Sequence, residues 1–421
     1  MSAHQTQAES IGILVGGGPA PGINGVISAA AIRCLAEGRK VLGIEQGFKW
    51  IMQGDVSKVR PLTLEQVSRL HFRGGSILKT ARANPTKNPE HLSQVLNSLD
   101  QLGVTGLITI GGDDTCFSAL TLERAAQGRL RVVHVPKTID NDLDLPQGVP
   151  TFGFQTARHL GTYAVKSILE DARTTSHWFF VVAMGRKAGH LALGIGKAAG
   201  ATLTVIPEEF PERPVRLAKV ADILAGAIIR RLSEGREDGV AVIAEGIAEI
   251  MNPEDFTAIG SLTRDEHGHV ELADLDLGRA LKEAVLDRLA PYSLAPTIRV
   301  KDLGFELRCV DPIPFDMEYC RDLGCSAAEF LMGGGTGAMV SIVNGAFSPI
   351  PFAGILDPAT QRTRVRMVDV ASESYQMARR YMIRLNRKDF EEPERLTRCA
   401  TVVGLSPEAF RERFASVIAH E

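Results

Sequence analysis

Short apolar runs alternate with longer amphipathic segments along most of the chain. The short runs have the length and the flanking turn residues of buried strands, and the longer segments have helical spacing. The predicted strands cover residues 11–15, 41–44, 107–110, 132–135, 179–183, 202–206 and 240–244. The predicted helices cover residues 22–36, 89–102, 115–126, 157–169, 192–199, 215–232 and 277–289. Strands and helices that alternate in this way indicate parallel sheets covered by helices, and therefore an α/β protein.

The alternation starts again near residue 150, and it therefore predicts two α/β lobes. A chain of 421 residues is also longer than one ordinary domain. With 44% hydrophobic and 23% charged residues, the composition is that of a globular protein and excludes a largely disordered chain.

Charge and targeting signals narrow the expected partners. The net charge of −3 gives no reason to expect a nucleic-acid or membrane-surface binder. No apolar run approaches the roughly 20 residues of a membrane span, and the polar residues 1–10 lack the apolar core of a signal peptide. The six cysteines form no CxxC pair, which favours thiols in a reducing compartment. We expect a cytoplasmic protein that binds neither nucleic acid nor membrane.

Two polar runs follow predicted strands and carry most of the candidate chemistry. Residues 111–115 read GGDDT, and residues 136–142 read PKTIDND. Ligands of open α/β sheets bind in crevices at the carboxyl ends of strands. Acid groups gathered there suit a divalent cation and a general base, and a lysine suits a phosphate. Although acids at a helix start are also ordinary caps, two adjacent acids exceed what a cap needs. The pattern predicts phosphoryl transfer.

Other segments add anion-binding candidates. Residues 16–22 read GGGPAPG and join the first strand to the first helix, where glycines and free N–H groups can bind an anion or simply form a tight turn. The prolines in this run break the dinucleotide fingerprint, and no P-loop lysine follows. Arg82 lies in an irregular polar stretch. Arg186 follows a strand in a Met-Gly-Arg turn and could bind a phosphate with two hydrogen bonds. Glu245 ends another strand and could accept a hydrogen bond from a sugar hydroxyl.

Taken in order, these runs resemble the phosphofructokinase family from residue 11 to about residue 335. The family's motifs, in chain order, are GGxAPGxN at residues 17–24, TIDND at 138–142, Met-Gly-Arg at 184–186, the sugar-binding glutamate at Glu245, an arginine pair nine residues apart at Arg299 and Arg308, and PxPxD at 312–316. The resemblance implies two Rossmann-like three-layer lobes of the phosphofructokinase type, with the active site between them. Residues 1–151 with about 307–360 would bind the phosphoryl donor. Residues 152–306 with about 361–421 would bind the sugar phosphate.

The resemblance also implies an activity and a set of roles. A phosphoryl group would pass to the 1-hydroxyl of fructose 6-phosphate with Mg²⁺, in glycolysis or gluconeogenesis, in a homodimer or homotetramer. Asp140 would be the general base, and Asp113 would hold Mg²⁺ through the donor. The groups that stabilise the transferred phosphoryl would be Lys137, Thr138 and Arg186. The donor-binding residues would be Gly17, Arg82, Asp114 and Thr115. The sugar-phosphate site would comprise Thr138, Asp140, Asp142, Met184, Gly185, Arg186, Glu245, Arg299, Phe305 and Arg308.

Two positions point to the donor. ATP-using members usually carry glycine where Asp114 stands, and many carry glycine where Lys137 stands, whereas pyrophosphate-using members look like this sequence at both. A second carboxylate would repel the α-phosphate of a nucleotide, at a cost of several kcal/mol in a partly desolvated site. We therefore expect pyrophosphate as the donor and a reversible reaction. An ATP-dependent phosphofructokinase is the alternative. A non-catalytic regulatory subunit is a lesser alternative, and the missing GxGxxG disfavours a dinucleotide oxidoreductase.

Some positions depart from the family's pattern. Pro19 stands where many members have aspartate, so any help with Mg²⁺ from that position is lost. Phe305 stands where histidine or tyrosine is common, which puts in question one hydrogen bond to the sugar phosphate. The arginine that a partner subunit supplies in the family has no clear match, and Arg173 or His177 lies nearest to its place.

Overall fold

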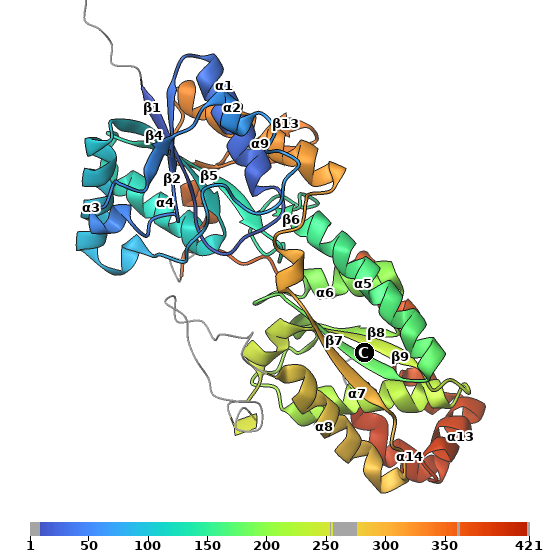
Figure 1. Cartoon of the computed structure of the whole chain (residues 1–421). Coiled ribbons are helices and arrows are strands. Elements are labelled where there is room, and N and C mark those ends of the chain that lie inside the picture. Colours follow the sequence, from blue (N-terminus) through green and yellow to red (C-terminus); the bar gives the residue numbers. More distant parts are fainter. Residues whose placement is uncertain (1–8, 253, 256–275, 360–362, 419–421) are drawn as a thin grey trace, which may run out of the picture. The chain divides into compact units, whose positions relative to one another are not determined.

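The fold is described from a computed structural model, which places residues 9–252, 254–255, 276–359 and 363–418 (Figure 1). The chain forms two compact units. Unit 1 contains the described residues within 1–157 and 305–366, and unit 2 contains those within 158–304 and 367–421. Each unit has its own sheet of mainly parallel strands with helices packed on it, which confirms the predicted α/β class.

The sheet of unit 1 has the strand order β14-β11-β5-β4-β1-β2-β3, with β6 paired to the end of β5. The strands are β1 Ser10–Val15, β2 Lys40–Ile44, β3 Val59–Pro61, β4 Val104–Gly111, β5 Arg131–Thr138, β6 Phe152–Gly153, β11 Ala338–Met339 and β14 Ile350–Pro351. Strand β1 pairs in parallel with both β2 and β4, and β4 pairs in parallel with β5. The loops after β1, β4 and β5 therefore leave the same edge of the sheet.

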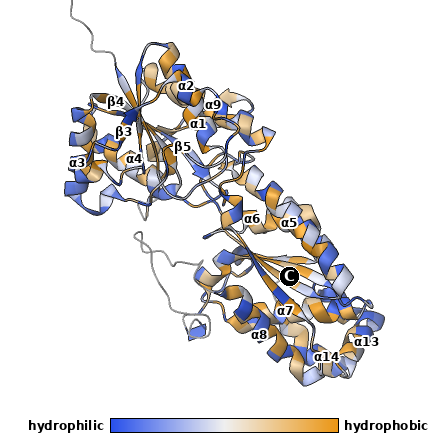
Figure 2. Ribbon diagram, in the orientation of Figure 1, coloured by the Kyte–Doolittle hydropathy of each residue, from blue (hydrophilic) through white to orange (hydrophobic). Residues whose placement is uncertain are grey.

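Helices cover this sheet and supply the rest of the core of unit 1. They are α1 Ile23–Ala36, α2 Leu64–Val67, α3 Pro89–Gln101, α4 Asp113–Ala126, α9 Pro314–Met332 and α10 Phe352–Ile355, and a small hairpin joins β12 Ile342–Val343 to β13 Ala346–Phe347. The apolar side chains of β1, β4 and β5 are buried, as expected of strands covered on both faces. Figure 2 shows these strands as mostly hydrophobic and the helices as mixed.

Unit 2 is built on a four-stranded parallel sheet with the order β10-β7-β9-β8. Its strands are β7 Trp178–Ala183, β8 Leu203–Val205, β9 Gly239–Ala244 and β10 Ile298–Leu303. Its helices are α6 His190–Ala199, α7 Leu217–Leu232, α8 Leu277–Leu289, α11 Glu373–Tyr381, α12 Arg387–Glu391, α13 Pro393–Val402 and α14 Pro407–Phe414. Helix α5, Phe154–Thr175, begins in unit 1 and continues into unit 2.

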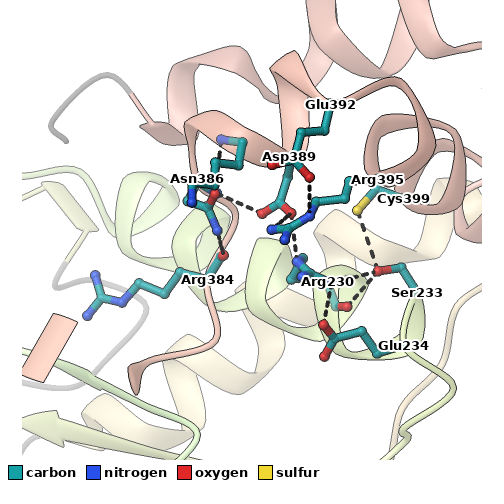
Figure 3. A network of polar contacts seen from close by, with 10 residues as sticks. Arg230, Ser233, Glu234, Arg384, Asn386, Asp389, Glu392, Arg395 and Cys399 are labelled. Atoms are coloured by element: carbon teal, nitrogen blue, oxygen red, sulfur yellow. Dashed lines mark hydrogen bonds and ion pairs between the residues drawn. The ribbon is translucent and has the colours of Figure 1, made fainter. Parts of the chain in front are cut away.

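Ion pairs with little exposure to solvent attach the C-terminal segment to unit 2 (Figure 3). Asp389, which is fully buried, lies 2.8 Å from Nε of Arg230 on α7. Arg384 pairs with Glu209 at 2.5 Å, and both side chains are at most 10% exposed. Breaking a buried pair by removing one partner typically costs about 3–5 kcal/mol, because the other charge stays buried. The segment after residue 367 is therefore an integral part of unit 2.

The predicted strands and helices are present, with ends that differ by a few residues. Helix α4 begins at Asp113, two residues before the predicted start, and α5 begins at Phe154 rather than at residue 157. Strand β5 continues through Thr138, although residues 137 and 138 were expected in a loop, because Lys137 and Thr138 pair with Phe152 and Gly153 of β6. None of the helices in the described ranges has both the length and the hydrophobicity to span a bilayer.

Candidate active site

Glycines shape the loop that follows β1. The amide of Gly16 donates to the carbonyl of Ile110 at 2.9 Å, and the amide of Gly17 donates to the carbonyl of Ala81 at 2.9 Å. A Cβ on Gly16 would lie 2.3 Å from Oγ1 of Thr115, a buried side chain that fills this place. Gly17 has φ of 75°, which favours glycine. The loop is therefore held against the segment that leads into Arg82.

Asp113 and Asp114 lie where β4 gives way to a helix, as predicted, and they form the first turn of α4. The carboxylate of Asp113 accepts a hydrogen bond from the amide of Asp114 at 2.9 Å. Both residues are half-buried. The positive end of the helix dipole stabilises negative charge at this position.

A buried histidine beneath this turn was missed by the sequence analysis. Nε2 of His134 lies 3.0 Å from the carbonyl of Gly111, and Nδ1 lies 2.9 Å from Oγ1 of Thr109. Burial lowers the pKa of His134 to about 3, so the ring is neutral. Because the Gly111 carbonyl can only accept, Nε2 carries the proton and donates it. A histidine in the otherwise apolar run 132–135 was the available signal.

Three cationic side chains gather beside the glycine loop. Lys137 is 5% exposed, and its Nζ donates to the carbonyl of Gly18. A Cβ on Gly18 would lie 2.5 Å from Nη2 of Arg308. Burial, together with the charges of Arg308 and Arg82, lowers the pKa of Lys137 to about 8. The positive charges of these side chains repel one another, and a bound anion would relieve this repulsion.

The loop after β5 brings carboxylates into the same unit. Oγ1 of Thr138 accepts a hydrogen bond from the amide of Asp140 at 3.0 Å. Burial and the negative charges of Asp140 and Asp113 raise the pKa of Asp142 well above its ordinary value. The structure thus brings Asp113, Asp140 and Asp142 close enough to interact.

Oxygen ligands of this kind fit a magnesium ion. Mg²⁺ is usually held by one or two carboxylates together with water and substrate phosphates. In the part of the chain that the structure describes, no group of three or more His, Cys, Asp or Glu side chains is arranged to hold a metal ion. Asp113 and its neighbours fit the open arrangement, in which the phosphates supply further ligands.

The pKa of Lys137 leads to a prediction about pH. We expect kcat/KM for an anionic donor to fall as the pH rises above about 8, because Lys137 then loses its charge in the free enzyme. The sign for stability is opposite. A lysine whose folded pKa is lowered destabilises the fold at low pH, and this cost disappears as the pH rises from about 8 to 10.5.

The measurement is kcat/KM against pH, with thermal unfolding followed in parallel. The control is Lys137→Met, which should have a lower kcat/KM and lack this descending limb. A limb that persists unchanged in Lys137→Met would show that another group titrates.

In unit 2, the ends of two neighbouring strands carry predicted sugar-phosphate residues. Met184, Gly185 and Arg186 follow β7, and Glu245 follows β9, with Ala183 directly opposite Ala244. The amide of Gly185 donates to Oε2 of Glu245 at 3.2 Å. A Cβ on Gly246 would lie 2.7 Å from the carbonyl of Arg186, so only glycine fits there.

Glu208 binds the loop that follows the Met-Gly-Arg turn, at Gly189. The sequence analysis did not predict a role for this residue. Its Oε1 accepts hydrogen bonds from the amides of Gly189 and Val368, both at 2.9 Å. Burial raises the pKa of Glu208. The residue lies three positions after the end of β8, between Pro207 and Glu209, and nothing in its local sequence marks a role.

The two arginines predicted to bind the sugar phosphate belong to different units. Arg299 is exposed near the start of β10, opposite Phe179, and Arg308 belongs to unit 1. Phe179 and Ala183 are four residues apart, which corresponds to about 13 Å along a strand. Within unit 2, Arg299 therefore lies near the opposite end of the sheet from Gly185 and Glu245.

Arg308 and Phe305 form a pair in unit 1. Phe305 is 67% exposed, and its ring centre lies 5.3 Å from the guanidinium carbon of Arg308. The described neighbours of Arg308 thus include Gly18 and Lys137 of the predicted donor side.

Asp316 gives the PxPxD motif a structural purpose. Its carboxylate is fully buried and accepts hydrogen bonds from the amides of Gly153 and Thr156, at 3.0 and 2.8 Å, and from the hydroxyl of Thr156 at 2.6 Å. Gly153 in turn is opposite Thr138 in the pairing of β6 with β5. Asp316 therefore orders the backbone that supports the loop containing Asp140.

Comparison with known proteins bears on this arrangement. The family model described as Phosphofructokinase matches residues 10–331. A relative from Thermotoga maritima, named pyrophosphate–fructose 6-phosphate 1-phosphotransferase, is 51% identical over 97% of this chain and 98% of the relative. A relative from Mycobacterium bovis, named ATP-dependent 6-phosphofructokinase, is 32% identical over 82% of this chain and 93% of the relative.

A solved structure shares the fold. It is described as a pyrophosphate-dependent phosphofructokinase from Marinobacter aquaeolei, and it matches with a TM-score of 0.67 and 16% identity over 89% of this chain and 90% of that chain. At this identity the likeness concerns the fold alone. The resemblance drawn from the order of the motifs is confirmed: this chain belongs to the phosphofructokinase family.

Proposed function

We propose that this protein transfers a phosphoryl group from inorganic pyrophosphate to the 1-hydroxyl of fructose 6-phosphate, giving fructose 1,6-bisphosphate and phosphate. The name of the relative that is 51% identical over nearly the full length supports this reaction. The carboxylates and cations gathered in unit 1 support it independently. Pyrophosphate and phosphate esters differ little in free energy of transfer, and the reaction is therefore reversible.

The proposed chemistry distributes the charges among a few side chains. Asp140 takes the proton of the 1-hydroxyl. The oxygen of that hydroxyl then bonds to the transferred phosphorus, while the bond between this phosphorus and the leaving phosphate breaks. Lys137, Thr138 and Arg186 stabilise negative charge on the moving group, which is the main requirement of phosphoryl transfer. Asp113, together with the phosphates of the donor, would hold Mg²⁺, and this ion would neutralise charge on the pyrophosphate oxygens. Gly17, Arg82 and Thr115 would bind the rest of the donor.

The sugar phosphate would be bound by residues that the motifs of the sequence predicted. Glu245 would accept hydrogen bonds from sugar hydroxyls, while Met184 and Gly185 shape its surroundings. Arg299 and Arg308 would help to place the sugar phosphate. The cytoplasmic location and the homodimeric or homotetrameric assembly stay predictions from the sequence.

The observation that favours pyrophosphate over ATP is the second acid on the first turn of α4. Asp114 adds a carboxylate directly after Asp113, on the first turn of the helix that follows β4. Two like charges about 4 Å apart repel by about 4 kcal/mol at an effective dielectric constant of 20. The α-phosphate of a nucleotide would meet this repulsion, and pyrophosphate has no such group.

A donor comparison tests the proposal. Purified protein is given fructose 6-phosphate and Mg²⁺ with either pyrophosphate or ATP, and fructose 1,6-bisphosphate formation is followed. We expect kcat/KM for pyrophosphate to exceed that for ATP by at least about 10²-fold, which corresponds to about 3 kcal/mol. The reverse reaction, started from fructose 1,6-bisphosphate and phosphate, should also run. A preference for ATP would establish the alternative enzyme, and no turnover with either donor would indicate a non-catalytic subunit.

A further inference from the structure

A short segment outside the family's matched region holds the loop that contains Asp140. The family model ends at residue 331, whereas residues 363–366 form the end of unit 1 and lie beside residues 141–149. Val365 forms an isolated antiparallel bridge with Leu143, and the amide of Arg366 donates to the carbonyl of Asp142 at 2.8 Å. The loop is thus paired with backbone from the end of unit 1.

The side chain of Arg366 binds this loop at several points. Nε donates to the carbonyl of Asn141 at 3.1 Å, and Nη2 donates to the side-chain oxygen of Asn141. Nη1 donates to the carbonyl of Val149 at 2.8 Å. One rigid guanidinium therefore joins the start of the loop to its end, because its N–H donors point in several directions within one plane.

Asn141 is the non-glycine residue of this loop with a left-handed backbone. Its φ of 57° is in the left-handed region, which few non-glycine residues adopt and which asparagine tolerates better than most. Its side-chain oxygen also accepts a hydrogen bond from the amide of Thr151 at 3.0 Å. Asn141 stands between Asp140 and Asp142, so its backbone angles decide where each of the two carboxylates points.

Charge adds to the geometry. The half-buried guanidinium of Arg366 interacts favourably with the carboxylate of Asp142, while burial itself lowers the pKa of Arg366. Asp142 also faces the negative charges of Asp140 and Asp113. The cation therefore offsets repulsion among carboxylates that phosphoryl transfer needs close together.

We propose that Arg366 is a positioning residue for the proposed phosphoryl transfer: it fixes the left-handed turn at Asn141 and thereby aims Asp140 at the hydroxyl that it deprotonates. This inference rests on the proposed function for its kinetic consequences, but its structural consequence does not depend on activity. Arg366 itself need not touch either substrate.

The kinetic test compares three variants. Arg366→Lys keeps the charge but cannot reach Asn141 and Val149 together, and Arg366→Met removes both the charge and the fork. We expect kcat to fall by about 10²-fold in Arg366→Met, the typical effect of a misplacement of about 1 Å, and by nearly as much in Arg366→Lys. KM for fructose 6-phosphate should change by less than about threefold. Adding guanidinium ion to Arg366→Ala, at concentrations that leave the fold intact, should restore part of kcat.

Arg364 provides the matched control on the same segment. Its Nε lies 2.6 Å from the carboxylate of Asp144, and its side chain is 45% exposed. Arg364→Met removes an arginine without touching Asn141, and we expect its kcat to stay within about twofold of the unaltered protein. If Arg364→Met lost as much kcat as Arg366→Met, the assigned role would be wrong. The loss would then come from any disturbance of residues 363–366 and not from the hydrogen bonds of the Arg366 guanidinium.

Hydrogen exchange separates this inference from the proposed reaction. In Arg366→Met, the amides of residues 138–151 should exchange at least about tenfold faster, while those of β4 and α4 keep their rates. Unchanged exchange in residues 138–151 would overturn the inference even if the enzyme is active. Faster exchange in these residues, in a protein that shows no turnover before mutation, would uphold the role of Arg366 in fixing the turn at Asn141 and refute the proposed reaction.

Discussion

Replacing Asp140 by serine is expected to lower kcat by about 10²–10⁴-fold, the usual range for loss of a general base, with little change in KM for fructose 6-phosphate. The 1-hydroxyl of the sugar must lose its proton as its oxygen attacks the phosphorus, and serine cannot accept that proton. The hydrogen bond from the residue 140 amide to Oγ1 of Thr138 does not use the side chain of residue 140 and survives the change. Steady-state kinetics with pyrophosphate, together with equilibrium binding of fructose 6-phosphate, provide the measurement.

Asp144 supplies the control for this experiment. It lies on the same loop and pairs with Arg364, and its side chain is 35% exposed. Asp144→Ser should therefore retain most of the activity. Near-normal turnover in Asp140→Ser would remove Asp140 from the role of base, and a large loss in both variants would point to disruption of the loop.

The second large effect concerns the choice of donor. The double variant Asp114→Gly with Lys137→Gly should bind and use ATP, and it should lose most of its activity with pyrophosphate. Glycine at position 114 removes the charge that repels an α-phosphate and opens space on the first turn of α4. Glycine at position 137 removes the ammonium group that lies against Gly18. The measurement is kcat/KM for each donor in the same preparation.

Single substitutions separate charge from size at position 114. Asp114→Asn keeps the shape and removes the charge, so it should admit ATP less than Asp114→Gly if space also matters. If the double variant neither binds ATP nor loses pyrophosphate activity, Asp114 and Lys137 do not determine the donor.

Local sequence was sufficient for the elements and for the positions of the polar runs. Strands such as β1 and β7 are short apolar runs between turn residues, and helix α8 was predicted with the ends that it has. The hydrophobic pattern reports burial within a few residues along the chain, and therefore it locates elements whatever their distant partners are. It also placed Asp113 and Asp114 where a strand becomes a helix, as observed.

Contacts between distant segments decided the rest. Arg366 and Asn141 are 225 positions apart, and Asp316 and Gly153 are 163 apart, so no local pattern links them. Burial and neighbouring cations, not the identity of the residue, lower the pKa of Lys137. The sheet register places Arg299 near the opposite end of β10 from the strand ends that carry Gly185 and Glu245.

The order of the motifs was enough to identify the family of this protein, because that order is far more specific than any one motif. Several of the motifs, such as Met-Gly-Arg and Glu245, follow strands, and strand ends are where an α/β sheet binds ligands. Sequence alone also indicated which residue types are available for phosphoryl transfer. Only the tertiary structure decided how those residues are held: by His134 under Gly111, by Asp316 behind β6 and by Arg366 around Asn141. The physical reason is that a side chain's charge, orientation and pKa depend on groups that folding brings near, and these can come from anywhere in the chain.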